Sequence, residues 1–169
     1  MQNKYAPIED YDYKMIEAYI DKDDVTDWYV NAFKKFNVNG FEVLKWNWSW
    51  WAFFGNIFYL LYRKAYLASF VVLVLTFLVG ALPFGHLILS ILTGGFAPYF
   101  VYKTYKEKKD EVEKRLDDEN QRIESIKALG GANEWALWLG VIVHLFIWGF
   151  AFLFISAFLA SIGLAFLIS

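Results

Sequence analysis

The chain has 169 residues, a net charge of −2, 58% hydrophobic residues and 21% aromatic residues. This length suggests one domain, or a small domain joined to a membrane bundle, and lipid can absorb more apolar surface than a soluble domain of this size can bury. The charge balance gives no basic field for nucleic acid. The absence of cysteine excludes disulfides, Cys-ligated zinc, iron–sulfur clusters and thiol nucleophiles.

Residues 1–45 predict a cytoplasmic helical region. Its first dozen residues are polar and acidic, unlike a cleaved signal peptide. A helix is expected from Asp12 to about Ile20, and a second from residues 24–26 to Phe36, each with apolar side chains at helical spacing on one side. Residues 37–40 (Asn-Val-Asn-Gly) should end the second helix, since Asn and Gly tolerate a left-handed stop.

Residues 46–64 carry four tryptophans among other aromatic residues and end in two cations. Such rings gather where apolar and aqueous phases meet. As a helix, residues 46–62 would cover roughly 25 Å, short of the ~30 Å hydrocarbon core, so we expect an interfacial or re-entrant helix. The two cations would anchor the topology or bind anionic lipid headgroups. The predicted membrane-interface residues are Trp46, Trp48, Trp50, Trp51, Tyr62, Arg63 and Lys64.

Residues 65–102 predict a transmembrane hairpin. Two uncharged apolar runs flank residues 83–86 (Pro-Phe-Gly-His), where proline ends one helix and glycine permits the reversal. With Lys64 and Lys103 both inside, the turn faces outward. The pair Gly94-Gly95 interrupts the second run and indicates either a broken transporter helix or a close helix crossing.

Residues 103–133 predict a charged cytoplasmic linker with one narrow apolar stripe. The helix is expected to break near residues 117–120 and fold back, because the chain must return to the membrane. An exposed stripe of this width is enough to dock on one partner. The predicted partner-binding residues are Val112, Leu116, Ile123 and Ile126.

Residues 134–169 predict the C-terminal transmembrane segment. The run is either one tilted span, favoured from Trp135 to about Ile155 with a bent helical continuation, or two short segments. Small residues at four-residue spacing allow close helix approach, either between copies or within the monomer. The predicted packing residues are Ala157, Ser161 and Ala165.

Two other patterns were weighed for cofactor or metal chemistry. His86 and His144 would lie at different membrane depths, which disfavours paired haem ligation, and an interhelical hydrogen bond from His144 is favoured. The aspartates of residues 21–27 lack the alternating ligands and glycine of a calcium loop. We therefore predict no cofactor, no metal site and no catalytic residue.

The run Asn47-Trp48, Ala52-Phe53-Phe54-Gly55, Tyr59 and Leu61-Tyr62-Arg63-Lys64, followed by Tyr66, resembles the signature of domain-of-unknown-function family 2628. Many members carry proline after the glycine and methionine after the lysine, where this chain has Asn56 and Ala65. The resemblance covers roughly residues 28–80 and extends more loosely to residue 133, through the Gly-Gly pair at 130–131. It implies a small integral protein of the bacterial inner membrane, with no known activity.

Together these patterns predict an all-α membrane bundle of about three spans with an interfacial aromatic helix and a small cytoplasmic helical domain. The expected protein is a non-enzymatic, multi-pass inner-membrane protein with a cytoplasmic N-terminus. Its expected role is an interaction, scaffold or regulatory component. The alternative is a small pore or transporter subunit assembled through the C-terminal small-residue face. The expected partners are the lipid bilayer and a protein, or a second copy of the chain, and not nucleic acid.

Overall fold

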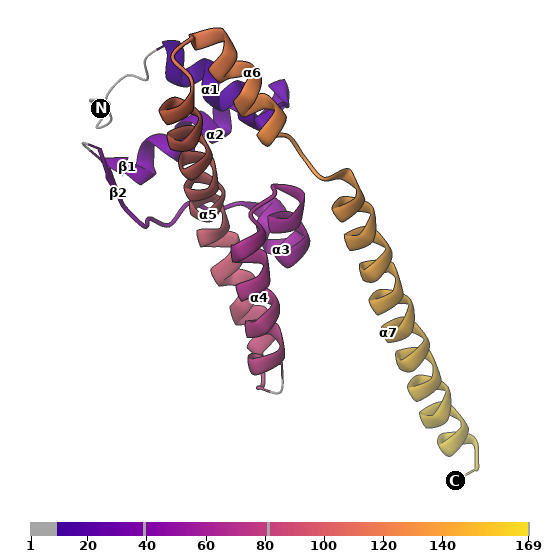
Figure 1. The fold of residues 1–169 in the computed structure, drawn as a ribbon. Helices are drawn as coiled ribbons and strands as arrows, with labels where there is room; N and C mark the ends of the chain where they lie inside the picture. The colour runs from indigo at the N-terminus through magenta and orange to yellow at the C-terminus, as the bar shows by residue number, and fades with distance from the viewer. Residues whose placement is uncertain (1–9, 39, 81, 169) are drawn as a thin grey trace.

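The computed structural model describes residues 10–38, 40–80 and 82–168, with side chains described as far as Ile162. The described chain is almost entirely helical, so the all-α prediction is confirmed (Figure 1). The elements are α1 (Asp10–Ile20), α2 (Asp23–Phe36), β1 (Asn37–Val38), β2 (Phe41–Glu42), α3 (Trp50–Tyr62), α4 (Tyr66–Val79), α5 (Gly85–Arg115), α6 (Glu119–Leu129) and α7 (Glu134–Ile168).

Helices α1, α2 and α6 pack with the charged half of α5, residues 103–115, and we call this group the charged cap. Acidic residues in the first turn of α2 and lysines in its last turn complement the helix dipole. The core of the cap is apolar and closed to solvent, and its fully buried side chains include Met15, Ile20, Phe36 and Ile126. Short helices of this kind are stabilised mainly by such packing.

The turn between α5 and α6 folds the chain back onto the cap. Leu116 leaves α5 with extended backbone angles, and Asp118 caps α6 by accepting a hydrogen bond from the backbone N–H of Gln121 at 2.9 Å. The side chain of Arg122 donates to the Leu116 carbonyl at 2.7 Å. Helix α6 then packs on α1 and α5, so the expected break near residues 117–120 is present.

A short β-hairpin follows α2 where the sequence predicted only a helix stop. Val38 pairs with Phe41, and Gly40 takes a positive φ of 85°. The Asn37 side chain accepts a hydrogen bond from the Gly40 N–H at 3.0 Å, which holds the reversal. After the hairpin, residues 43–49 run without regular structure to the start of α3.

Helices α4 and α5 form the predicted hairpin, with the reversal at Pro83 and Phe84. Phe84 has a φ of 60°, and α5 begins at the next residue. Helix α5 continues without interruption from its apolar half into the charged cap, which joins the two parts of the molecule rigidly (Figure 1). Beside this hairpin lies α3, which packs against both α4 and α5.

Helix α7 is one continuous helix of 35 residues, about 50 Å long. Only its first turns are held by the rest of the chain: Gly140 lies against the Phe58 ring of α3. Beyond that point α7 stands apart from α4 and α5 and extends past their turn (Figure 1). We call α4, α7 and residues 85–102 of α5 the apolar helices.

Candidate membrane-border site

Two stretches of the described chain are long and apolar enough to cross a membrane. They are α5 and the stretch Glu119–Ile162, whose apolar part is α7, while α4 is apolar but shorter. The most apolar window of the second stretch is not buried at all inside the protein. A core helix of a soluble protein would be mostly buried, so the exposure of α7 favours a lipid environment.

The aromatic segment before α3 lies across α5 at Gly94 and Gly95. The backbone N–H groups of Asn47 and Ser49 donate to the carbonyls of Gly95 and Gly94 at 2.9 and 2.8 Å. Pro98 has no N–H, so the Gly94 carbonyl four residues earlier has no helical donor, and Ser49 supplies one. Of the two alternatives for this glycine pair, the structure has the close crossing.

Aromatic rings complete this crossing. The rings of Trp48 and Trp46 cover Gly94 and Gly95. A Cβ atom at Gly95 would meet the Trp46 ring, where there is no space for it, and one at Gly94 would make a tight contact of 3.0 Å with the Trp48 ring. Trp46 stacks on Trp48 with ring centroids 6.0 Å apart, and Trp48 meets Trp50 edge-on at 5.1 Å. Trp46, Trp50 and Trp51 remain exposed, with Trp51 at 77%. Three of the four predicted interface tryptophans, Trp46, Trp48 and Trp50, therefore form one connected group.

Helix α3 is kinked at Asn56, the position after Gly55. Asn56 has φ 46° and ψ −120°, an uncommon conformation for any residue other than glycine. Its side chain donates to the Ser90 hydroxyl at 3.1 Å and accepts from the Thr93 hydroxyl at 3.4 Å. The Ser69 hydroxyl donates to the Ile57 carbonyl beside the kink at 3.3 Å. These bonds satisfy polar groups among the apolar helices, and the kink falls at the position where many members of the family that the sequence resembles carry proline.

Arg63 is buried, although the sequence predicted a residue at the membrane interface. Its guanidinium donates to the Ile20 carbonyl at the end of α1 at 3.2 Å. It also lies over the rings of Tyr29 and Tyr62, at 4.7 and 5.1 Å from their centroids. Burial of this cation is possible because a helix end and two aromatic faces surround it. Its Nε has no hydrogen-bond partner in the described chain.

Two lysines meet at the end of α6. Lys64, with a φ of 57°, donates to the Gly130 carbonyl, and Lys108 donates to the Leu129 carbonyl at 2.8 Å. Burial and the neighbouring Lys64 charge lower the pKa of Lys108. Sequence reasoning missed Lys108, because its partner is a backbone carbonyl 21 residues away.

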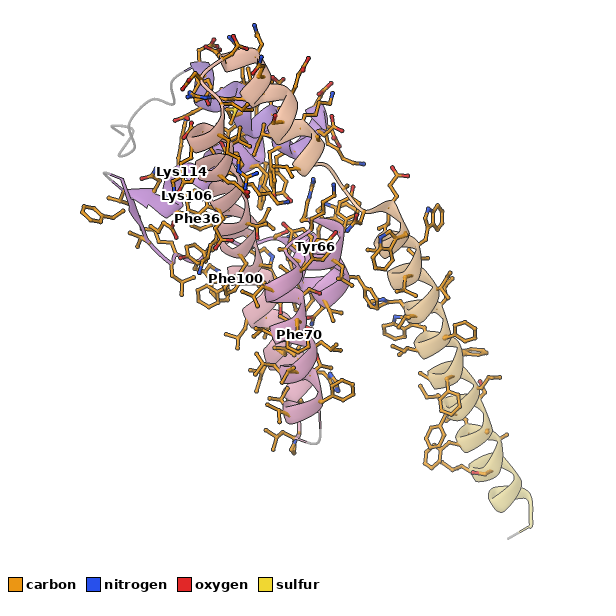
Figure 2. The ribbon with its side chains drawn as sticks, viewed as in Figure 1. Phe36, Tyr66, Phe70, Phe100, Lys106 and Lys114 are labelled. Carbon is orange, nitrogen blue, oxygen red and sulfur yellow. The ribbon has the colours of Figure 1, made fainter. Side chains whose placement is uncertain are left out.

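Asn133 ties the start of α7 to the same place. Its backbone N–H donates to the Tyr62 carbonyl at 2.9 Å. Its side chain donates to the Leu61 carbonyl at 3.0 Å and to the Tyr66 hydroxyl at 2.8 Å. Figure 2 shows Tyr66 at the start of α4. The ends of α1, α3 and α6 and the starts of α4 and α7 thus converge at one junction.

The predicted partner-binding stripe is not an exposed surface. Val112 and Ile126 lie in the core of the charged cap, and Leu116 and Ile123 pack against that core. The fold-back of α6 covers the stripe with the chain's own helices, so the expectation of an open stripe was wrong. Its residues stabilise the fold, and they no longer support partner binding.

The remaining predicted residues lie apart from the junction. Ala157 and Ser161 are exposed on α7, while the Ala165 side chain lies outside the described residues. His144 bonds the Gly140 carbonyl of its own helix at 2.7 Å, where an interhelical bond was expected. His86 is exposed near the α4–α5 turn. Within the described residues, no cluster of His, Asp and Glu could hold a metal ion.

The fold and this junction define a class: an all-helical protein with helices long and apolar enough to cross a membrane, joined to a charged helical cap. The model of the family described as "Protein of unknown function (DUF2628)" matches residues 17–107, more than half of the chain. The chain belongs to this family. No curated protein and no solved structure matches it significantly. The matched region includes the aromatic segment and Arg63 but ends before α6 and α7.

Proposed function

We propose that this protein is a multi-pass integral protein of the bacterial inner membrane, with the charged cap and the N-terminus in the cytoplasm. The observation that carries the proposal is the exposure of α7. Its side chains include Phe146 at 76% and Trp148 at 70% exposed. Transfer of such rings from water to lipid is favourable by about 25 cal/mol per Å² of apolar surface.

The same pattern on α4 and α5 supports the proposal. Phe70 and Phe77 are 63% and 78% exposed on α4, and Figure 2 labels Phe70 on this helix. The hairpin turn carries exposed Leu82 and Phe84, and the first charges on the α5 side are those of the cap. This arrangement supports a turn on the outer side and a basic, wet inner side.

Within this setting we propose a non-enzymatic role as an interaction, scaffold or regulatory component. The charged cap is a rigid cytoplasmic body held on the membrane by α5 and by the junction, which suits a protein that positions other groups near the membrane. With the stripe buried, the most exposed apolar side chains beside the cap are Phe41 in β2, at 76%, and Leu44 shortly after it, at 54%. A protein partner would meet the cap there.

The alternative, a small pore or transporter subunit, now has less support. The glycine pair of α5 packs against Trp46 and Trp48 and does not break the helix. Asn56 bonds to both Ser90 and Thr93, so these polar side chains among the apolar helices have partners within the described chain. What remains for this alternative is the exposed small face at Ala157 and Ser161.

Extraction of membranes with alkaline carbonate tests the membrane proposal. The full chain should stay in the membrane pellet and be released only by detergent. Release into the carbonate supernatant would contradict it. The interaction role is tested with a photoreactive residue placed in the β1–β2 hairpin, which should form a cross-link to a partner in intact cells. The double variant Phe41→Ser, Leu44→Ser should abolish this cross-link. The control Leu129→Ser, at the end of α6, should leave it unchanged. Absence of any such cross-link would remove the interaction role.

A further inference from the structure

The junction gathers four cations at the proposed inner border of the membrane. Lys22 lies 5.8 Å from the centroid of the Tyr62 ring, and Arg63 lies 5.1 Å from the same centroid. Lys64 and Lys108 bind successive carbonyls at the end of α6. We call Lys22, Arg63, Lys64 and Lys108 the cationic junction. We infer that the cationic junction binds the phosphate headgroup of an anionic phospholipid, an inference that rests on the proposed membrane location.

None of the four cations of the cationic junction takes part in the ion pairs of the described residues. Lys22 has acidic neighbours: Asp21 and Asp23 flank it in the chain, and Glu134 acts on it from the start of α7. The other three cations bind backbone carbonyls at the ends of α1 and α6. Each of these helix ends supplies only about half a negative charge. Arg63, Lys64 and Lys108 are therefore held by partial charges and by no paired carboxylate of the described chain.

The burial of Arg63 makes its lack of a paired carboxylate more costly. Arg63 is only 6% exposed, and its Nε lacks a hydrogen-bond partner in the described chain. A buried cation without a carboxylate is costly unless another anion completes its surroundings. Lys22 is exposed, and Lys64 and Lys108 are half-buried, so an anion can reach these three lysines from solvent. The buried guanidinium of Arg63 adds its positive charge to the attraction.

The surroundings of the cationic junction suit a lipid rather than a free anion. Tyr66 at the start of α4 is 54% exposed, and Trp135 and Trp138 in the first turns of α7 are 56% and 64% exposed. Such rings sit at the headgroup level of a bilayer. Directly beyond them run the open apolar side chains of α4 and α7, including Leu67 at 76% exposed. A headgroup on the cations would place its acyl chains along these helices.

The test uses the full-length protein in a neutral detergent, with thermal unfolding and native mass spectrometry as readouts. Dioleoylphosphatidylglycerol should raise the melting temperature and appear as a bound adduct at concentrations at least about tenfold below those needed for dioleoylphosphatidylcholine. Lys22→Gln removes one positive charge and no hydrogen bond to a helix end, because the Lys22 side chain makes no capping bond at the start of α2. It should weaken phosphatidylglycerol binding about fivefold, since one basic residue near an anionic surface contributes about 1 kcal/mol.

Lys108→Gln should weaken binding similarly. If loss of the contact with the Leu129 carbonyl unfolds Lys108→Gln, Lys22→Gln still tests the inference. Lys114→Gln, on the far end of α5 (Figure 2), is the matched control and should leave binding within about twofold. Equal binding of the two lipids, or equal loss with Lys114→Gln, would overturn the inference. The same shift with inorganic phosphate alone would also overturn it, since a free anion would then suffice. These failures concern a protein still held in the membrane, whereas carbonate release defeats the membrane proposal itself.

Discussion

The charged cap and the apolar helices differ in the burial of their large apolar side chains. In the cap, Phe36 and Met15 are completely buried, and charged residues face outward. On α7, Phe146 and Phe150 are about three-quarters exposed, at 76% and 75%. Helix α5 runs through both parts without a break. The difference teaches that protein packing stabilises the cap, whereas most apolar side chains of α7 are left uncovered by the protein, as the proposed membrane location requires.

The largest expected effect contrasts Phe36 with Phe146. Phe36→Ala should lower the free energy of unfolding by about 3–5 kcal/mol, because it removes a fully buried ring from the cap core. Phe146→Ala removes the same atoms from an open surface of α7 and should change it by less than about 0.5 kcal/mol. Chemical denaturation in detergent micelles measures both. Equal losses would show that α7 is packed against protein, which would end the contrast.

Arg63 tests the connection between the cap and the apolar helices. Arg63→Ala should cost about 1.5–3 kcal/mol, because the Ile20 carbonyl loses a charged donor and two rings lose a cation. The control is Arg115→Ala, whose ion pair with Glu111 is exposed on both sides and is worth at most about 1 kcal/mol. The midpoint of urea unfolding, followed by far-UV circular dichroism, should separate the two variants. If Arg115→Ala proved the more damaging, Arg63 would not join the parts.

The crossing of the aromatic segment over α5 predicts a difference between two glycines of the apolar helices. Gly95→Ala should cost about 1–3 kcal/mol, because the new methyl group meets the Trp46 ring. Gly149→Ala has open space around it and should be neutral or stabilising by up to about 1 kcal/mol. Thermal unfolding monitored by tryptophan fluorescence distinguishes them. A neutral Gly95→Ala would mean that residues 46–49 do not lie on α5.

Tyr29 and Tyr19, two buried tyrosines of the cap, should differ by a smaller amount in the free energy of unfolding lost on replacement by phenylalanine. Tyr29 and Tyr59 share a hydrogen bond of 2.9 Å, so Tyr29→Phe should cost about 1–2 kcal/mol by leaving one hydroxyl alone. The Tyr19 hydroxyl is buried and has no hydrogen-bond partner in the part of the chain that the structure describes, so Tyr19→Phe should be near neutral. Equilibrium unfolding at pH 7 is the measurement. A clear loss in Tyr19→Phe would reveal a partner for that hydroxyl.

Tyr19 also predicts a pH dependence. Burial raises the pKa of Tyr19 above its ordinary value of 10.0, so the folded protein keeps this proton where the unfolded chain loses it. The resulting stability is complete below pH 10 and is lost as the pH rises beyond it. Stability measured from pH 9 to 11 should therefore fall, and less steeply in Tyr19→Phe. Parallel slopes in the two proteins would contradict this assignment.

Much of the fold could be predicted from the sequence because local signals and long-range packing agree there. Apolar spacing located α1 and α2, Pro83 and Gly85 located the hairpin turn, and the acidic run at 117–120 located the fold-back. The signature residues from Asn47 to Tyr66 identified the family. These features depend on residues close together in the chain.

The contacts at the junction could not be predicted, because they join backbone groups far apart in sequence. From the sequence, Arg63 is interpreted as an interface anchor, because the chain order does not show that Ile20 and Tyr29 lie beside it. The apolar stripe near Ile126 looked exposed because periodicity shows that a helix has an apolar face without showing what covers it. At the crossing of the aromatic segment over α5, one local signal was available. Pro98 has no N–H, so the carbonyl of Gly94, four residues earlier, needs a hydrogen-bond donor from outside the helix.

Site-directed labelling tests the central claim, that lipid surrounds the apolar helices and the charged cap lies inside, most directly. The chain has no cysteine, so single cysteines at His86 in the hairpin turn and at Lys114 in the cap can be compared without background. In intact spheroplasts a membrane-impermeant maleimide should label His86→Cys and should label Lys114→Cys only after lysis. Labelling of Lys114→Cys from outside, or recovery of the chain in the soluble fraction without detergent, would contradict the account.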